Sequence, residues 1–457
     1  MFGLVEGWDL MIYFVFIGVL LFVSKIIKEK VPFLNKVILP TALIAGFLGL
    51  IISDGFLGLV TLDREGIIHE IVYHSLAIGF IAISLKRDKN ETNKKVWSTG
   101  MIIVMTYLLQ AFIGVMVVIV FFPKLFLGAG LLLPLGFGQG PGLAQSQGQS
   151  FAEGVGLLSE GAALGSTIAT VGFLVGGIVG VIALNYLARK YKIKVNKIHE
   201  ENSRITETFE VETIKEIRVF DTLTSQATII LVIYFAVYLT LAFLETNLRE
   251  IGGIAETFAG VFHGFNFLIG ILYALLFKKV LVWFDNRGKN TNFITNNYVL
   301  SNISSISFNF LIVAAVLRIT REAIDEYYLL VAVMALFATV FTLLFIRFIV
   351  KKVYDEKYFV HYFLGLFGML TGTASTGLAL LKGVDPEYKS PVAEEMVVGS
   401  GTAISMALPL FALLAFPGMA ITNDNDLFNY LTIGIPVIYF LILLVITLKV
   451  NSKKTSN

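Results

Sequence analysis

The feature that most constrains this chain is a series of long apolar stretches along nearly its whole length. Each holds about 20 mostly apolar residues, the length that an α-helix needs to cross the hydrocarbon core of a bilayer. Of the 457 residues, 56% are hydrophobic and only 15% are charged, so a soluble domain would lack polar surface. Eleven stretches qualify as transmembrane helices: 8–27, 37–60, 67–85, 96–122, 162–188, 223–244, 254–277, 293–317, 327–346, 395–417 and 427–449.

The charged and metal-binding residue types exclude several functions. A net charge of +2, from 35 basic and 33 acidic residues, does not supply the concentrated basic face that nucleic-acid binding needs. The chain has no cysteine, and its five histidines are scattered without metal-ligand spacing. It contains no GxSxG elbow, and no span carries paired acids. We therefore expect no nucleic-acid partner, no cofactor and no enzymatic activity.

Two further apolar stretches, 125–148 and 359–382, are interrupted at their centres by segments rich in Gly, Ser and Thr. Such segments break a continuous helix. If both stretches are re-entrant hairpins that leave on the side they enter, all but five of the 35 Lys and Arg residues face the cytoplasm. Because short cytoplasmic loops are rich in basic residues, this arrangement is favoured. It predicts a multi-pass protein of the bacterial inner membrane with its N-terminus outside and its C-terminus in the cytoplasm.

An internal repeat indicates how the spans are organised. GLAQSQG at 142–148 and GLALLKG at 377–383 share their first three residues and their last, at an offset of about 235 residues that also pairs 159–169 with 394–404. Each half then holds five spans with a hairpin before the fifth, and an odd number of spans inverts the second half. The predicted fold is an all-α polytopic membrane protein with two inverted-topology repeats, each with a re-entrant hairpin. The predicted domains are a first repeat at 1–188, a cytoplasmic connector at 189–222, a second repeat at 223–417 and an additional transmembrane helix within 418–457.

The hairpin tips are the candidate binding site. Non-helical backbone persists at membrane depth only where protein or a water-filled cavity surrounds it. Glycines there allow close backbone approach, neutral oxygens suit a sodium ion, and half-helix N-termini suit a carboxylate. The residues predicted to bind substrate or sodium are Gly136, Gly138, Gln139, Gly140, Gly142, Gln145, Ser146, Thr371, Gly372, Thr373, Ala374, Ser375 and Thr376.

Other conspicuous residues receive structural interpretations. We expect Gly172, Gly176, Gly177 and Gly180, spaced along the fifth span, to serve helix packing. Glu160 and Glu395 occupy equivalent repeat positions, and we expect both to be solvated at the membrane interface, with proton or cation coupling as the alternative. No Arg or Lys is expected deep within a span, where it could neutralise a carboxylate.

The hairpins resemble those of the glutamate:sodium symporter family, which is related in architecture to the sodium/citrate carriers. The first-hairpin pattern of that family, close to SGGHGTGAAW, lies without gaps over 136–145, and its second pattern, near GATPTA, lies over 372–377. The segment FLNKVILPTALIAG at 33–46 is also similar. The resemblance implies an elevator-type, sodium-coupled carrier for glutamate or a related amino acid or small carboxylate. It further implies a homodimer that holds the substrate between the hairpin tips.

Other functions remain open from the residues alone. The same fold could couple transport to protons, or exchange another organic anion. A channel is a different class, although selectivity filters usually come from rings of identical loops rather than two unlike hairpins in one chain. An intramembrane enzyme is the other alternative.

Overall fold

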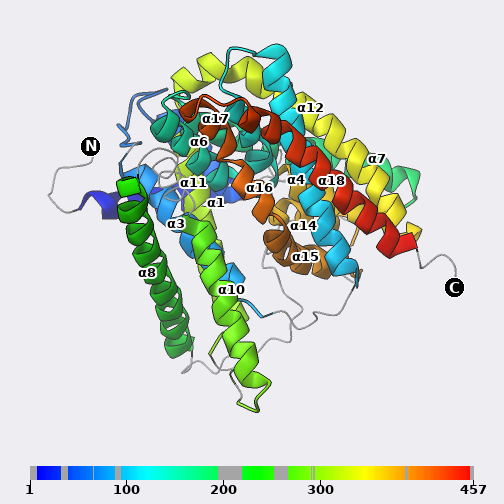
Figure 1. Cartoon of the computed structure of the whole chain (residues 1–457). Helices are drawn as coiled ribbons and strands as arrows, with labels where there is room; N and C mark the ends of the chain where they lie inside the picture. Colours follow the sequence, from blue (N-terminus) through cyan, green and yellow to red (C-terminus); the bar gives the residue numbers. More distant parts are fainter. Residues whose placement is uncertain are drawn as a thin grey trace. The chain divides into compact units, whose positions relative to one another are not determined.

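The chain is almost entirely helical. The computed structural model describes residues 8–31, 40–64, 66–87, 94–193, 219–251, 266–289, 291, 294–385 and 390–452. Within these ranges the only β-pairing is an isolated bridge between Ser53 and Val60. Nine of the described helices are long and apolar enough to cross a membrane, so the predicted all-α polytopic membrane fold is confirmed. They are α1 (Asp9–Lys30), α3 (Ile67–Ser84), α4 (Lys94–Phe121), α7 (Gly161–Lys190), α8 (Val219–Ile251), α10 (Asn266–Asp285), α11 (Asn297–Leu317), α12 (Arg321–Val353) and α18 (Leu427–Ser452) (Figure 1).

The stretch 37–60 is not one continuous spanning helix, and that prediction was wrong. Its helix, α2 (Thr41–Ile52), has 12 residues. At about 1.5 Å per residue it reaches only about 18 Å, well short of a hydrocarbon core of about 30 Å. It ends before Asp54 and Gly55, where the chain turns and pairs back on itself through the Ser53 bridge. Residues 37–39 lie outside the described part of the chain.

The stretch 395–417 is also not a continuous helix. It is divided among α15 (Val392–Met406), α16 (Leu408–Leu413) and α17 (Phe416–Thr422). The axis bends by 46° between Val398–Met406 and Leu408–Thr422. Pro409 and Pro417 lie in the first turns of α16 and α17. Each lacks the N–H that would continue the preceding helix and clashes with an earlier carbonyl, so the span breaks there. The predicted span 254–277 is described only from Asn266 onward.

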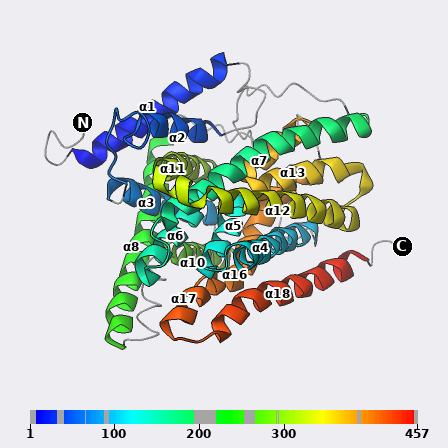
Figure 2. The same ribbon diagram turned by 90° about the horizontal axis from the view of Figure 1, so that it is seen from above.

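The chain forms two compact units. Unit 1 comprises residues 1–69, 92–198 and 312–457, and unit 2 comprises residues 70–91 and 199–311. In unit 1, α4 packs against α12, α15 and α18, and α12 also packs against α7 (Figure 2). Both predicted hairpins belong to this unit.

Each predicted hairpin is a pair of helical arms that folds back on itself. Hairpin 1 consists of η1 (Leu127–Leu131), α5 (Leu132–Pro134), η2 (Leu135–Gln139) and α6 (Pro141–Val155). At the open end of this hairpin, where its two arms begin and end, the rings of Phe126 and Phe151 lie 5.1 Å apart. Hairpin 2 consists of α13 (Phe359–Thr371) and α14 (Ala374–Lys382). These arms are so close that a β-carbon on Gly368 would lie 2.9 Å from Gly377 Cα.

Hairpin 1 differs from the sequence prediction in two details. Its second arm ends at Val155 rather than 148. The repeat offset of 235 residues would pair the break at Gly140 with Ser375, whereas hairpin 2 breaks at Gly372 and Thr373. The second arms are therefore out of register by about one helical turn in an ungapped alignment of the repeats.

The open end of hairpin 1 lies at one end of unit 1. The Arg318 guanidinium donates to Gln149 Oε1 at 2.8 Å, and Thr320 Oγ1 donates to Glu160 Oε2 at 2.7 Å. Next to Arg318, the Leu317 carbonyl accepts a hydrogen bond from Arg64, which also pairs with Asp54 at 2.8 Å. Burial raises the pKa of Asp54, but the hydrogen bond and positive charge of Arg64 outweigh it and hold that pKa below its usual value.

The open end of hairpin 2 lies at the opposite end of unit 1. Lys95 pairs with Asp355 at 3.5 Å, and Asn451 donates to Ser98 at 3.0 Å. The rings of Tyr191 and Phe359 lie 5.8 Å apart. Because α4, α7 and α12 each run from one of these ends to the other, the two hairpins enter unit 1 from opposite ends.

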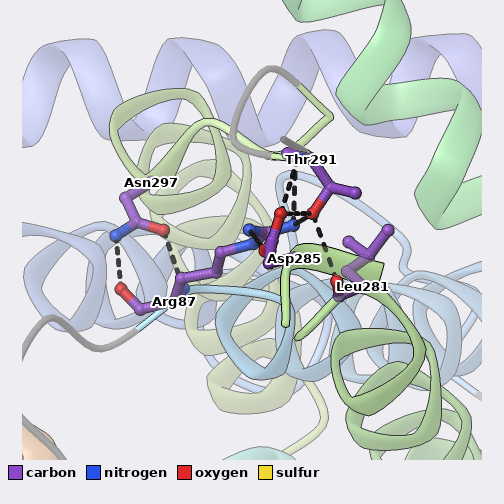
Figure 3. A network of polar contacts seen from close by, with 5 residues as sticks. All are labelled: Arg87, Leu281, Asp285, Thr291 and Asn297. Carbon is purple, nitrogen blue, oxygen red and sulfur yellow. Dashed lines mark hydrogen bonds and ion pairs between the residues drawn. The ribbon is translucent and has the colours of Figure 1, made fainter. Parts of the chain in front are cut away.

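Unit 2 has an apolar core formed by Ile81, Ala82 and Leu85 with residues of three other helices: Ile230, Ile233, Ala274 and Leu300. A polar network ties helix ends of this unit together (Figure 3). Arg87 donates to Asp285 at 2.8 Å and to both the carbonyl and the hydroxyl of Thr291. Asn297 exchanges two hydrogen bonds with the Arg87 backbone. The end of α3, the end of α10 and the start of α11 are thereby joined.

The two ends of α12 provide a test of membrane sidedness. Arg321 and Asp355 flank this helix, and their side chains are 71% and 65% exposed. We expect Arg321→Cys to react with an impermeant maleimide from outside intact cells and Asp355→Cys to react only in inverted vesicles. The chain has no native cysteine to interfere. Labelling of both from one side would contradict a spanning α12, and a reversed pattern would overturn the predicted orientation.

The network around Arg87 predicts a stability effect. We expect Arg87→Ala to lower the melting temperature of the purified protein by several degrees, because it removes the ion pair with Asp285 and the donor to the Thr291 carbonyl. Lys279→Ala is the matched control, since it removes an exposed basic residue of the same unit. Equal melting temperatures for the two variants would show that the network does not stabilise the fold.

Candidate functional site

The tip of hairpin 1 is shaped by one glycine. Gly140 separates η2 from α6 with φ of 96° and ψ of 176°, a conformation that is essentially restricted to glycine. Pro141 then begins α6, where its missing N–H and fixed φ suit the first helical position. In hairpin 2, Gly372 and an extended Thr373 separate α13 from α14. Both hairpins therefore contain a short non-helical segment at the tip.

The two tips meet inside unit 1. A β-carbon on Gly140 would lie 3.7 Å from Thr373 Cγ2. Helix α7 passes both: a β-carbon on Gly172 would lie 2.6 Å from the Thr371 carbonyl and 3.2 Å from Phe137 Cα. We call this meeting point of Phe137–Gly140, Thr371–Thr376 and the Gly172–Gly176 part of α7 the tip crossing.

Of the α7 glycines predicted to serve helix packing, Gly172, Gly176 and Gly180 lie against hairpin 2. A β-carbon on Gly176 would lie 3.1 Å from both Thr371 Oγ1 and Thr376 Cγ2, and one on Gly180 would lie 2.5 Å from Leu380 Cδ1. Because Gly176 touches two residues of the hairpin, a large side chain there would disturb the tip crossing as well as the helix packing.

Helix α4 reaches both hairpins from adjacent turns. Tyr107 Oη donates to the Gly138 carbonyl at 3.1 Å. Gln110 Nε2 donates to the Leu370 carbonyl at 2.9 Å and to Thr342 Oγ1 on α12 at 3.1 Å. These side chains supply hydrogen bonds to carbonyls that lie close to the helix breaks. The sequence prediction missed them, although Gln110 is the only amide within 96–122 and could have been noticed for that reason.

Several buried polar atoms of hairpin 1 and its neighbours have no hydrogen-bond partner among the described residues. Leaving such an atom unsatisfied costs free energy, so each one requires an explanation. A bound ligand is one explanation, because it would supply the missing partner. They are Gln110 Oε1, Gln139 Nε2, Gln145 Oε1, Gln147 Nε2 and Thr170 Oγ1.

The predicted binding residues divide into two groups. Those at the tip crossing are Gly138, Gln139, Gly140, Thr371, Gly372, Thr373 and Thr376, together with Ala374 as the first residue of α14. The side chain of Ser375 lies outside the described part of the chain.

The second group lies away from the tip crossing. Gly136 faces Ile168 and Ala169 of α7, and Gly142 is buried in the first turn of α6. Gln145 and Ser146 lie one to two turns further along α6, where Gln145 Nε2 is 3.5 Å from His69 Nδ1.

The two equivalent glutamates have different environments. Glu160 is half-buried and accepts its hydrogen bond from Thr320. Glu395 is only 2% exposed and accepts a hydrogen bond of 2.6 Å from Tyr362, whose ring stacks on that of Tyr354. Interfacial solvation was therefore the wrong interpretation for Glu395, because α13 folds over it. Arg318 is likewise only 2% exposed, although it follows the end of α11.

The conformation of Gly140 predicts a specific loss. We expect Gly140→Ala to abolish or strongly impair ligand-dependent activity, because a β-carbon disfavours φ of 96° by about 1–3 kcal/mol. Gly288→Ala is the matched control, since Gly288 also has positive φ, at 81°, but lies in an exposed turn of unit 2 with open space around it. The measurement is uptake into proteoliposomes per folded protein. Equal losses in both variants would show that backbone strain acts only through general stability.

No protein-family model and no curated protein matches this chain. The resemblance to the glutamate:sodium symporters therefore stays a hypothesis based on the two hairpin motifs.

Proposed function

We propose that this chain is a secondary active transporter that takes up glutamate, or a related amino acid or small carboxylate, together with sodium. One observation supports this above all: two broken hairpins enter unit 1 from opposite ends and bring their tips together. A ligand held at such a crossing can be exposed to either side by moving one hairpin at a time. This alternation is what a carrier requires and what a permanently open channel lacks.

The chemistry of the tip crossing favours a ligand of low charge. The named tip side chains are amides and hydroxyls, which suit sodium and the polar groups of a solute. Helices α6 and α14 begin at the tips, and the N-terminus of each carries roughly half a positive charge. That charge can balance one carboxylate but not three. A monoanionic or zwitterionic amino acid is therefore a better substrate than citrate.

The remaining parts of the proposal come from the family resemblance and the basic-residue count. They are an elevator-type mechanism, a homodimer, the bacterial inner membrane and an outside N-terminus. The division into two compact units supports the first, since an elevator needs one rigid unit that moves and one that stays.

Proton coupling is the second candidate, and the buried Glu395 favours it. A carboxyl group that is 2% exposed and bonded to Tyr362 could bind and release a proton during transport. If protons drive uptake, Glu395→Gln should remove the pH dependence while leaving exchange of substrate across the membrane intact. If sodium drives uptake, the variant should retain its sodium requirement.

The decisive experiment is uptake of labelled L-glutamate and citrate into proteoliposomes, with sodium replaced by potassium at two pH values. We expect uptake of glutamate to need sodium and to vary little with pH, because Gln139 replaces the histidine of the family pattern and does not titrate. Empty liposomes are the control. Undiminished uptake in potassium, or a preference for citrate, would contradict the proposal.

A further inference from the structure

The orientation of one buried amide is determined by its hydrogen bonds. Gln110 is fully buried on α4, and its Nε2 donates to the Leu370 carbonyl at 2.9 Å. A backbone carbonyl can only accept, so exchanging the nitrogen and oxygen of this amide would place two acceptors against each other. The nitrogen therefore faces hairpin 2, and Oε1 points elsewhere.

The Oε1 atom of Gln110 lies beside the tip of hairpin 1. It is 3.4 Å from the position that a β-carbon on Gly138 would occupy, and no described residue donates a hydrogen bond to it. The next residue, Gln139, carries a buried Nε2 that has no acceptor among the described residues. At the tip of hairpin 1, Gln139 therefore carries a buried donor, and Gln110 places a buried acceptor beside Gly138; neither atom has a partner among the described residues.

A ligand that satisfies both atoms needs both a donor and an acceptor. An α-amino acid has this arrangement, since its ammonium carries three N–H donors and its carboxylate accepts. We propose that Gln110 Oε1 accepts a hydrogen bond from the protonated amine of the substrate, and that Gln110 thereby selects amino acids over carboxylates without an amine. This inference rests on the proposed function. In this arrangement the oxygen of the Gln110 amide contacts the substrate at the tip of hairpin 1, and its nitrogen holds the end of α13 in hairpin 2.

The test compares two ligands that share a carbon skeleton but differ at the amine: L-glutamate and glutarate. Their affinities are measured by competition against glutamate uptake in proteoliposomes. Gln110→Met and Gln110→Glu both lose the Nε2 donor to Leu370, but only Gln110→Glu keeps a side-chain acceptor. Thr342→Val removes a second acceptor of Nε2 and leaves Oε1 in place.

We expect the unmodified protein to prefer glutamate over glutarate. In Gln110→Met the ratio of the affinities for glutamate and glutarate should fall by about 10- to 100-fold, while Gln110→Glu and Thr342→Val should keep the ratio of the unmodified protein. Loss in both Gln110 variants would assign Gln110 to holding hairpin 2 only and would overturn the inference. So would an unchanged preference in a folded Gln110→Met protein, or equal affinities in the unmodified protein. Absence of any glutamate uptake by the unmodified protein would instead reject glutamate as the substrate in the proposed function.

Discussion

The structure depends on one constraint: hydrocarbon offers no hydrogen-bond partner to a peptide group. A helix satisfies its own backbone, but the two hairpins are broken where the chain is buried, so other groups must meet carbonyls at the breaks. Tyr107 and Gln110 do this from adjacent turns of α4, for Gly138 and Leu370. The carbonyls near each break are held by side chains of a neighbouring helix, and this allows two irregular tips to persist deep inside unit 1.

Close backbone packing is the second condition for the tip crossing. Glycines on α7 let Thr371 and Phe137 approach the helix axis more closely than any side chain would permit. The second arm of hairpin 1 is fitted to α7 in the same way, since a β-carbon on Gly165 would meet the Ala144 backbone. Hairpin 1 and α7 are therefore closely packed, and the small residues along this contact are structural requirements even where they touch no ligand.

Charge is confined largely to the ends of the helices. In unit 1, Arg64 and Arg318 lie near the open end of hairpin 1, and Lys95 lies near the open end of hairpin 2. In unit 2, Arg87 joins three helix ends with hydrogen bonds to Asp285 and Thr291. Such contacts hold the termini of helices whose buried faces are mostly apolar. The tip crossing itself contains amides, hydroxyls and backbone dipoles.

The sequence by itself determined the helical membrane class, most of the spans and the positions of both hairpins, because hydropathy and helix-breaking glycines are local properties. It did not reveal that α2 is short or that Pro409 and Pro417 divide the tenth span, since apolar composition outweighed the turn signals in those stretches. Only the tertiary structure decided that Glu395 is buried and that Gln110 reaches Leu370. Those contacts join residues that are far apart in sequence: 260 positions separate Gln110 from Leu370. No periodicity or motif encodes such a pairing, because it arises only when α4 packs against both hairpins.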